Sequence, residues 1–150
     1  MKIVKSLGTS VRSYMNPSAH SVPSVVVTSG GLKKLKFELP GVPPSWNKLI
    51  HLHWSKYQAI KQEWEWLVKI AAPRGMIRQP LGTASISVTC YVSHPARRDS
   101  DNIFIKPILD QLVKLNLIRA DDASVVESVK IRVRPAGGSA ERTLVELLGR

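Results

Sequence analysis

Hydrophobic and polar residues alternate in four segments of the chain, as expected for strands that bury one face. In one of them, for example, Ile86, Val88 and Cys90 alternate with polar neighbours. The four segments are residues 34–40, 85–92, 125–133 and 142–148. The turn-prone Gly137-Gly138-Ser139 separates the last two, so these are predicted to be consecutive strands.

Two segments have a helical period instead. Steps of three and four residues relate Tyr57, Ile60, Trp64, Leu67 and Ala71, which predicts a helix that ends near residue 72, before a proline. Ser55 and Gln58 have the spacing of a capping box at its start.

The second helix is predicted from the apolar residues Ile108, Leu109, Leu112, Val113 and Leu115. Pro107 cannot lie deep inside an undistorted helix. The helix therefore begins near Lys106, or residues 102–106 form a looser first turn.

The element order β-α-β-α-β-β predicts one α+β domain over residues 34–150, with two main helices packed on a mixed β-sheet. Residues 1–33 are interpreted as a loosely ordered, basic, serine-rich tail, because they lack acidic residues and a sustained period. An organellar transit peptide, a DNA-contacting arm and a misassigned start would have a similar composition.

Charge narrows the class of partner. The 150 residues include 22 Lys+Arg against 11 Asp+Glu, a net charge of +11, which favours nucleic acid over an anionic membrane surface. No apolar run approaches the length of a membrane span. The single cysteine, Cys90, cannot form an internal disulfide and is predicted to be a core residue, which fits a reducing, cytoplasmic location.

Residues 45–54 combine polar and aromatic side chains that suit contacts with nucleic acid. Asn47 and Lys48 are the candidate phosphate contacts in this loop. Trp46 and Trp54 are interpreted as caps of the core. The histidines at positions 51 and 53 are expected to face solvent or DNA, because no spacing typical of zinc ligands supports them.

Every aspartate of the chain lies between positions 99 and 122, although the protein is basic. If residues 99–101 are extended, Asp99 and Asp101 project to the same side, roughly 7 Å apart. Together with Asp121 or Asp122 they would offer the hard oxygen ligands that Mg²⁺ prefers. Lys106 could offset charge on a phosphate.

Other interpretations of these residues remain open. An Asp-x-Asp occurs by chance, and Asp-Asp before a strand is often a turn or cap. Arg97, Arg98 and the strand residues Lys130 and Arg132 are candidate DNA contacts, but a basic strand face can equally be a solvated surface.

The order of these motifs resembles the RusA family of Holliday-junction resolvases. The resemblance covers about residues 35–148 and rests on Pro43-Pro44-Ser45-Trp46-Asn47-Lys48-Leu49, Arg98-Asp99-Ser100-Asp101-Asn102, Lys106-Pro107-Ile108-Leu109-Asp110-Gln111-Leu112 and Asp121-Asp122. It implies that Asp99, Asp101 and Asp122 are metal-binding catalytic residues and that Lys106 is an essential lysine. It further implies a bacterial or phage-encoded homodimer that nicks opposing strands of a four-way junction and leaves ends that a ligase can seal.

Two spacings depart from the family pattern. One residue more than usual separates Asp101 from Lys106, and on a regular helix one residue rotates a side chain by about 100°. A bulge or a late helix start is needed to absorb it. The interval from Asp110 to Asp122 is also one residue longer, which leaves Asp121 as a substitute ligand.

The leading hypothesis is therefore a Mg²⁺-dependent, structure-selective endodeoxyribonuclease that resolves Holliday junctions in DNA recombination and repair. The alternatives are a noncatalytic nucleic-acid-binding protein and a nuclease for other branched DNA, such as flaps or forks.

Overall fold

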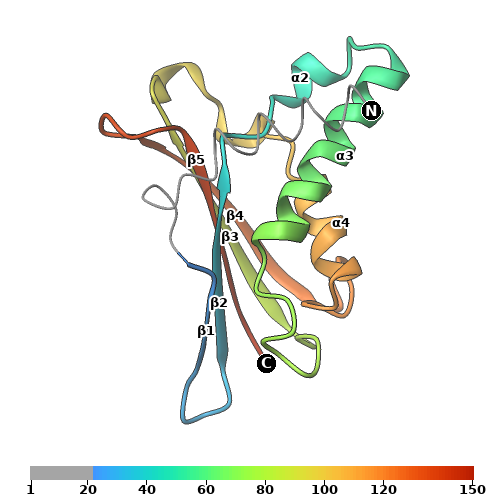
Figure 1. Ribbon diagram of the computed structural model, residues 1–150, viewed down its shortest axis with the longest axis vertical. Coiled ribbons are helices and arrows are strands. Elements are labelled where there is room, and N and C mark those ends of the chain that lie inside the picture. The colour runs from blue at the N-terminus through green and yellow to red at the C-terminus, as the bar shows by residue number, and fades with distance from the viewer. Residues whose placement is uncertain (1–21) are drawn as a thin grey trace.

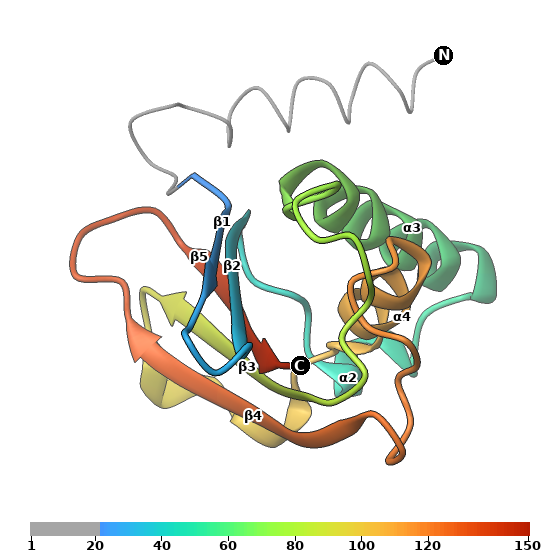
Figure 2. The ribbon, with the colours of Figure 1, turned by 90° about the horizontal axis from the view of Figure 1, so that it is seen from below.

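The computed structural model describes residues 22–150. Its two longer helices pack on one face of a five-stranded mixed sheet (Figures 1 and 2). The strands are β1 (Ser24–Val27), β2 (Lys33–Pro40), β3 (Ala84–Val92), β4 (Val126–Pro135) and β5 (Arg142–Gly149). The helices are α2 (Trp46–Leu49), α3 (Trp54–Ala71) and α4 (Lys106–Lys114). The predicted single α+β domain is confirmed.

The strand order across the sheet is β1-β2-β5-β3-β4. Among the strands of residues 22–150, only β3 and β4 run parallel, and α4 lies between them in the chain, as a parallel pair requires a crossover connection. The other neighbours are antiparallel. The last strand in the chain, β5, thus occupies the middle of the sheet.

Strand alternation determines which face is covered by the helices. Ile86, Val88 and Cys90 of β3 are at most 1% exposed and belong to the core. On the helices, Trp64 of α3 and Leu112 of α4 are buried against them, as the helical period predicted. Cys90 is therefore a core residue as expected, and burial raises the pKa of its thiol to about 11.

The prediction for residues 1–33 was wrong in part. Ser24–Val27 forms β1 and pairs with Lys33–Lys36 of β2, so the sheet begins inside the segment that was interpreted as a tail. Residues 1–21 lie outside the described residues, and the prediction of a tail there remains a prediction. No helix in residues 22–150 is long and apolar enough to cross a membrane.

The start of α3 also differs from the prediction. The N-cap is His53, whose Nδ1 accepts a hydrogen bond from the backbone N–H of Ser55 at 3.2 Å. Ser55 lies inside the first turn, so the capping box of Ser55 and Gln58 was wrong. A histidine nitrogen here replaces the oxygen acceptor that caps most helices.

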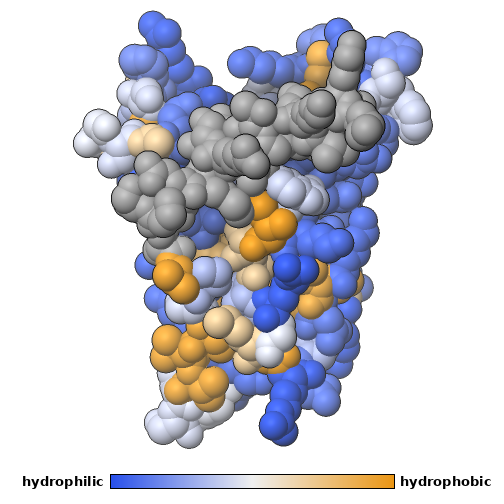
Figure 3. Space-filling model, viewed as in Figure 1, coloured by the Kyte–Doolittle hydropathy of each residue, from blue (hydrophilic) through white to orange (hydrophobic). Residues whose placement is uncertain are grey.

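The face of the molecule seen in Figure 3 has distinct hydrophobic and hydrophilic regions. Hydrophobic atoms gather over β1 and the lower part of β2, where Val26 and Val27 are 56% and 61% exposed. The upper end of the same view, towards the loop that follows β3, is mainly hydrophilic.

Candidate nucleic-acid and metal site

The loop after β3 contains two short 3-10 turns, η1 (Pro95–Arg97) and η2 (Ser100–Asn102). Asp99 is the N-cap of η2, and its Oδ1 accepts a hydrogen bond from the backbone N–H of Asp101 at 3.1 Å. Residues 99–101 are consequently not extended, and the alternation expected for Asp99 and Asp101 was wrong. An aspartate readily bonds the backbone two residues ahead, which favours a turn over a strand.

Both carboxylates of this acidic loop, Asp99 and Asp101, are exposed. The side chain of Asp101 makes no hydrogen bond or ion pair with any residue in 22–150. Its two oxygens are therefore available to a ligand from solution, and its replacement removes no contact that holds the fold.

The proline-rich loop before α2 is joined to the segment that follows the acidic loop. The N–H of Asn47 donates to Oδ1 of Asn102 at 3.2 Å, and the N–H of Phe104 donates to the carbonyl of Pro44 at 3.1 Å. Between these bonds, Ser45 and Ile103 form an isolated antiparallel bridge. Two motifs that are far apart in the sequence are thus held in direct contact.

The extra residue before Lys106 is absorbed outside α4. Ile105 is the N-cap, Lys106 is the first helical residue, and Pro107 follows it in the first turn, where a missing N–H costs nothing. Of the two options left open by the sequence, the first applies, because α4 starts at Lys106 and the preceding 3-10 turn already ends at Asn102.

Lys106 points to carboxylates other than those of the acidic loop. Its Nζ lies 3.1 Å from Oδ1 of Asp110 and 4.0 Å from Oδ2 of Asp121. The hydrogen bond that Lys106 donates to Asp110 is the main cause that raises the pKa of Lys106 above its ordinary value, with smaller contributions from the charges of Asp110 and Asp121. Of the consecutive aspartates Asp121 and Asp122, it is Asp121 that lies beside Lys106.

Asp110 is the centre of this charged cluster. Its side chain is 18% exposed and also lies 3.7 Å from Nζ of Lys61 on α3, which in turn is 3.9 Å from Glu65. Two lysines from different helices thus converge on one half-buried carboxylate. The i,i+4 spacing of Lys106 and Asp110 was a sequence signal for the first contact, whereas the contact with Lys61 depends on how α3 packs against α4.

Asp122 has a local structural role. Its Oδ1 accepts hydrogen bonds from the N–H and the hydroxyl of Ser124, and its carbonyl accepts from the N–H groups of Val125 and Val126. The bonds from Ser124 lower the pKa of the Asp122 carboxyl. Asp122 thus caps the turn that leads into β4, as the alternative interpretation had it.

The geometry does not gather a ready-made set of three metal ligands. Within residues 22–150, no three His, Cys, Asp or Glu side chains are placed to hold one metal ion. Mg²⁺, however, is usually bound through one or two carboxylates together with waters and substrate phosphates. The exposed oxygens of Asp99 and Asp101 fit that kind of site, and the Mg²⁺ site remains a prediction.

The candidate DNA contacts of the loops surround this region. Asn47 and Lys48 on α2 are exposed, as is Arg97 at the end of η1. Arg98 is half-buried and lies near enough to Cys90 to act on its thiol electrostatically. The first three side chains are free to reach a phosphate, whereas Arg98 is only partly exposed.

The basic residues of β4 lie on the face of the sheet opposite the helices. Lys130 pairs with Ser87 and Arg132 with Thr89, and directly paired residues project to the same side. On the other side Ile131 and Val133 pack against the core. The predicted alternation of β4 is confirmed.

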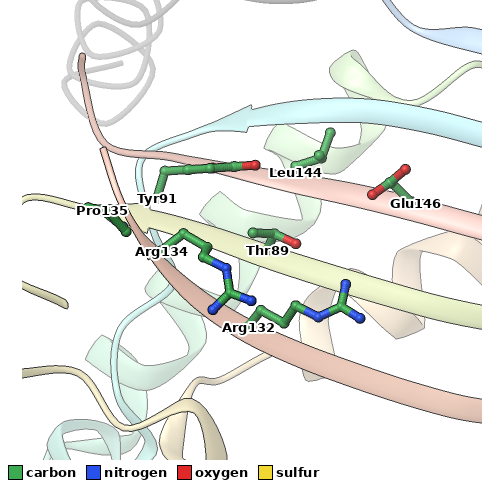
Figure 4. A pocket seen from close by; sticks show the side chains of 7 residues that line it. All are labelled: Thr89, Tyr91, Arg132, Arg134, Pro135, Leu144 and Glu146. Atoms are coloured by element: carbon green, nitrogen blue, oxygen red, sulfur yellow. The ribbon is translucent and has the colours of Figure 1, made fainter. Parts of the chain in front are cut away.

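An open cavity of about 430 Å³ lies on this uncovered face (Figure 4). Arg132 and Arg134 extend along it, with Tyr91 and Glu146 opposite. Arg132 donates a long hydrogen bond of 3.4 Å to Ser87, and neither arginine is ion-paired within residues 22–150. This face is a second cationic surface besides the loops.

Comparison with known proteins adds no assignment. The sequence matches no protein-family model, and no curated protein is significantly similar to it.

Proposed function

We propose that the protein is a Mg²⁺-dependent, structure-selective endodeoxyribonuclease that acts on branched DNA, with the four-way junction as its preferred substrate. One observation carries the proposal: motifs that are far apart in the sequence are joined in pairs by contacts. Asn47 bonds Asn102, and Lys106 lies beside Asp121.

The residues of this region have complementary roles in the proposed reaction. The carboxylates of Asp99 and Asp101 offer oxygens for a divalent cation next to a phosphodiester. Bound there, Mg²⁺ would supply a more acidic water and offset charge on the phosphate. Lys106 would offset charge on the phosphate or on the leaving oxygen, provided that DNA draws its ammonium away from Asp110.

The charge distribution supports a DNA substrate. The net charge of +11, the exposed lysines and arginines of the loops and the basic face of β4 all favour a polyanion. A junction presents two equivalent strands for cutting, so we expect a homodimer that places one site on each.

A noncatalytic nucleic-acid-binding protein is the second candidate. It is favoured by one specific observation, namely that Asp99 and Asp122 each cap a local turn. Under this alternative the aspartates brace loops of a basic surface, and DNA is bound without being cut.

Cleavage of a synthetic four-way junction separates the two candidates. The nuclease proposal expects paired nicks with Mg²⁺ and none with EDTA. It also expects Asp101→Asn to bind the junction and to lose cutting by about a hundredfold or more, because an amide is a poor ligand for the cation. Glu127→Gln, an exposed acid at the start of β4, is the matched control and should cut normally.

Two outcomes would reject the nuclease. Asp101→Asn that cuts as well as the wild type would remove the acidic loop from the reaction. Absence of cutting on junctions, flaps and forks alike would favour the noncatalytic alternative. If flaps or forks are cut faster than junctions, the substrate preference is wrong while the chemistry stands.

A further inference from the structure

Trp46 is held rigidly and is nevertheless exposed. Its ring stacks on Phe104 with centroids 5.2 Å apart and planes 29° apart, and Tyr57 meets it edge-on at 6.3 Å and 78°. Phe104 is only 4% exposed, whereas Trp46 is 44% exposed. One face of the indole is therefore covered by a buried ring, and much of the remaining surface is open to solvent.

The sequence suggested that Trp46 covers one end of the hydrophobic core, but a side chain in that role would be less than 44% exposed. A large aromatic group that is fixed on one side and open on the other is preorganised to receive another planar group. Offset stacking of aromatic rings is favourable beyond the area that it buries.

Trp46 is also fixed relative to the acidic loop. It lies between Ser45, which bridges Ile103, and Asn47, which bonds Asn102. Its stacking partner Phe104 comes three residues after Asp101. The open indole and the carboxylates thus lie on two segments that are hydrogen-bonded to each other, so a strand bound at one passes close to the other.

The surrounding charge indicates the class of partner. No acidic residue occurs between Glu38 and Glu63, whereas Lys48 and Lys56 lie in that interval. Both lysines are exposed, and neither is ion-paired within residues 22–150. An aromatic platform flanked by unpaired cations fits a polyanion with planar groups, and a second copy of this chain would bring like charges together.

We infer that Trp46 is a stacking platform for an unpaired nucleobase of the DNA strand that lies along the acidic loop. This inference rests on the proposed function for the position of the strand. Bases inside an intact duplex already stack on each other, so the platform is accessible only to a base at a branch point, gap or single-stranded end. Trp46 thereby favours branched over fully paired DNA.

Binding in EDTA tests the platform without any dependence on cleavage. The probe is a gapped oligonucleotide with 2-aminopurine as the unpaired base, compared with the same sequence fully paired. Wild-type protein should quench the unpaired probe on binding. Trp46→Leu should bind the gapped DNA about 5- to 100-fold more weakly, as loss of one base–aromatic stack predicts, and should leave binding to the intact duplex almost unchanged.

Two variants control for loss of aromatic surface in general. Trp46→Phe keeps a ring on Phe104 and should retain most of the quenching. Trp54→Leu removes a tryptophan that is 71% exposed and belongs to none of the ring pairs around Trp46, and should bind as the wild type does. Equal weakening by Trp46→Leu and Trp54→Leu, or unchanged binding by Trp46→Leu, would overturn the inference.

A crosslinking measurement keeps the inference testable if Trp46→Leu does not fold. Irradiation of wild-type protein with a gapped DNA that carries 5-iodouracil at the unpaired position should crosslink Trp46, as located by mass spectrometry. A crosslink only to other residues would overturn the platform. If the protein crosslinks at Trp46 but does not cut junctions, the proposed reaction is refuted and the stacking platform is retained.

Discussion

The backbone N–H of Asn47 donates a hydrogen bond of 3.2 Å to the side-chain oxygen of Asn102, across 55 positions of sequence. The bond joins the loop before α2 to the end of the acidic loop. The side-chain oxygen of Asn102 is the fixed acceptor of this bond. The residue after Asp101 therefore needs a side-chain oxygen, which a merely solvated turn would not require.

Asn102→Ala should lower the free energy of unfolding by about 1 kcal/mol, because it leaves the N–H of Asn47 without this acceptor. Asn102→Asp keeps an oxygen in the same place and should lose less. Urea unfolding of the two variants and the wild type measures the difference. Equal stability of all three proteins would mean that the bond does not contribute to folding.

Lys106→Gln should lower the melting temperature at neutral pH and should cease to matter in strong alkali. The pKa of Lys106 is raised above its ordinary value of 10.5, chiefly by the hydrogen bond that it donates to Asp110. Its contribution is thus complete below that value and is lost as the pH rises through the higher pKa of the folded state. Thermal unfolding of the variant and the wild type, from neutral to strongly alkaline pH, follows this loss.

Lys48→Gln is the matched control for that experiment, because Lys48 is exposed and forms no ion pair within residues 22–150. It should have little effect at either pH. The role of the Lys106–Asp110 pair would be refuted if both substitutions changed the melting temperature alike. Added salt should reduce the effect of Lys106→Gln, since the lysine side chain is 61% exposed.

Ser124→Ala should raise the pKa of Asp122 towards its ordinary value of 3.8, because it removes the hydroxyl whose hydrogen bond is the largest cause of the lowering, although the backbone N–H at position 124 remains. The stabilising effect of the lowered pKa is present above pH 3.8 and is lost as the pH falls through the pKa of the folded state. Carbon NMR titration of the Asp122 carboxyl measures the shift. Ser139→Ala, in the β4–β5 turn, should leave the titration unchanged.

Gly149→Ala should destabilise the protein by about 1–3 kcal/mol or more, as expected when atoms are forced into a packed region. A Cβ at this position would lie 1.9 Å from the carbonyl oxygen of Thr83, and backbone cannot move away cheaply. At Gly30 a Cβ would meet nothing within 4 Å, so Gly30→Ala should be almost neutral. Similar denaturant midpoints for the two variants would contradict this packing.

The strands and main helices were predictable because each buries one side. Leu35 and Phe37 of β2, and Trp64 of α3, report their environment through spacing alone. β1 was missed because Ser24–Val27 is short and has no alternation, and its two last residues are exposed. Its pairing with β2 depends on a neighbouring strand, which local sequence does not encode.

The candidate site was predictable as a set of motifs but not as a set of contacts. Composition drew attention to the aspartates, yet the partner of Lys106 is decided by helical spacing to Asp110 and by the path of the chain back to Asp121. The exposure of Trp46 was equally inaccessible, because the sequence does not reveal which side of the ring Phe104 covers. Tertiary packing determines both features.

The central position of β5 in the sheet bears on how the chain folds during synthesis. β2 and β3 share no ladder, and each pairs with β5 instead, through registers that include Phe37 with Val145 and Val88 with Val145. Until β5 has emerged from the ribosome, the hairpin of β1 and β2 and the unit of β3, α4 and β4 have no common hydrogen-bonded ladder. The sheet therefore closes late, through contacts of long sequence separation that slow folding, and deletion of β5 would divide it into two parts.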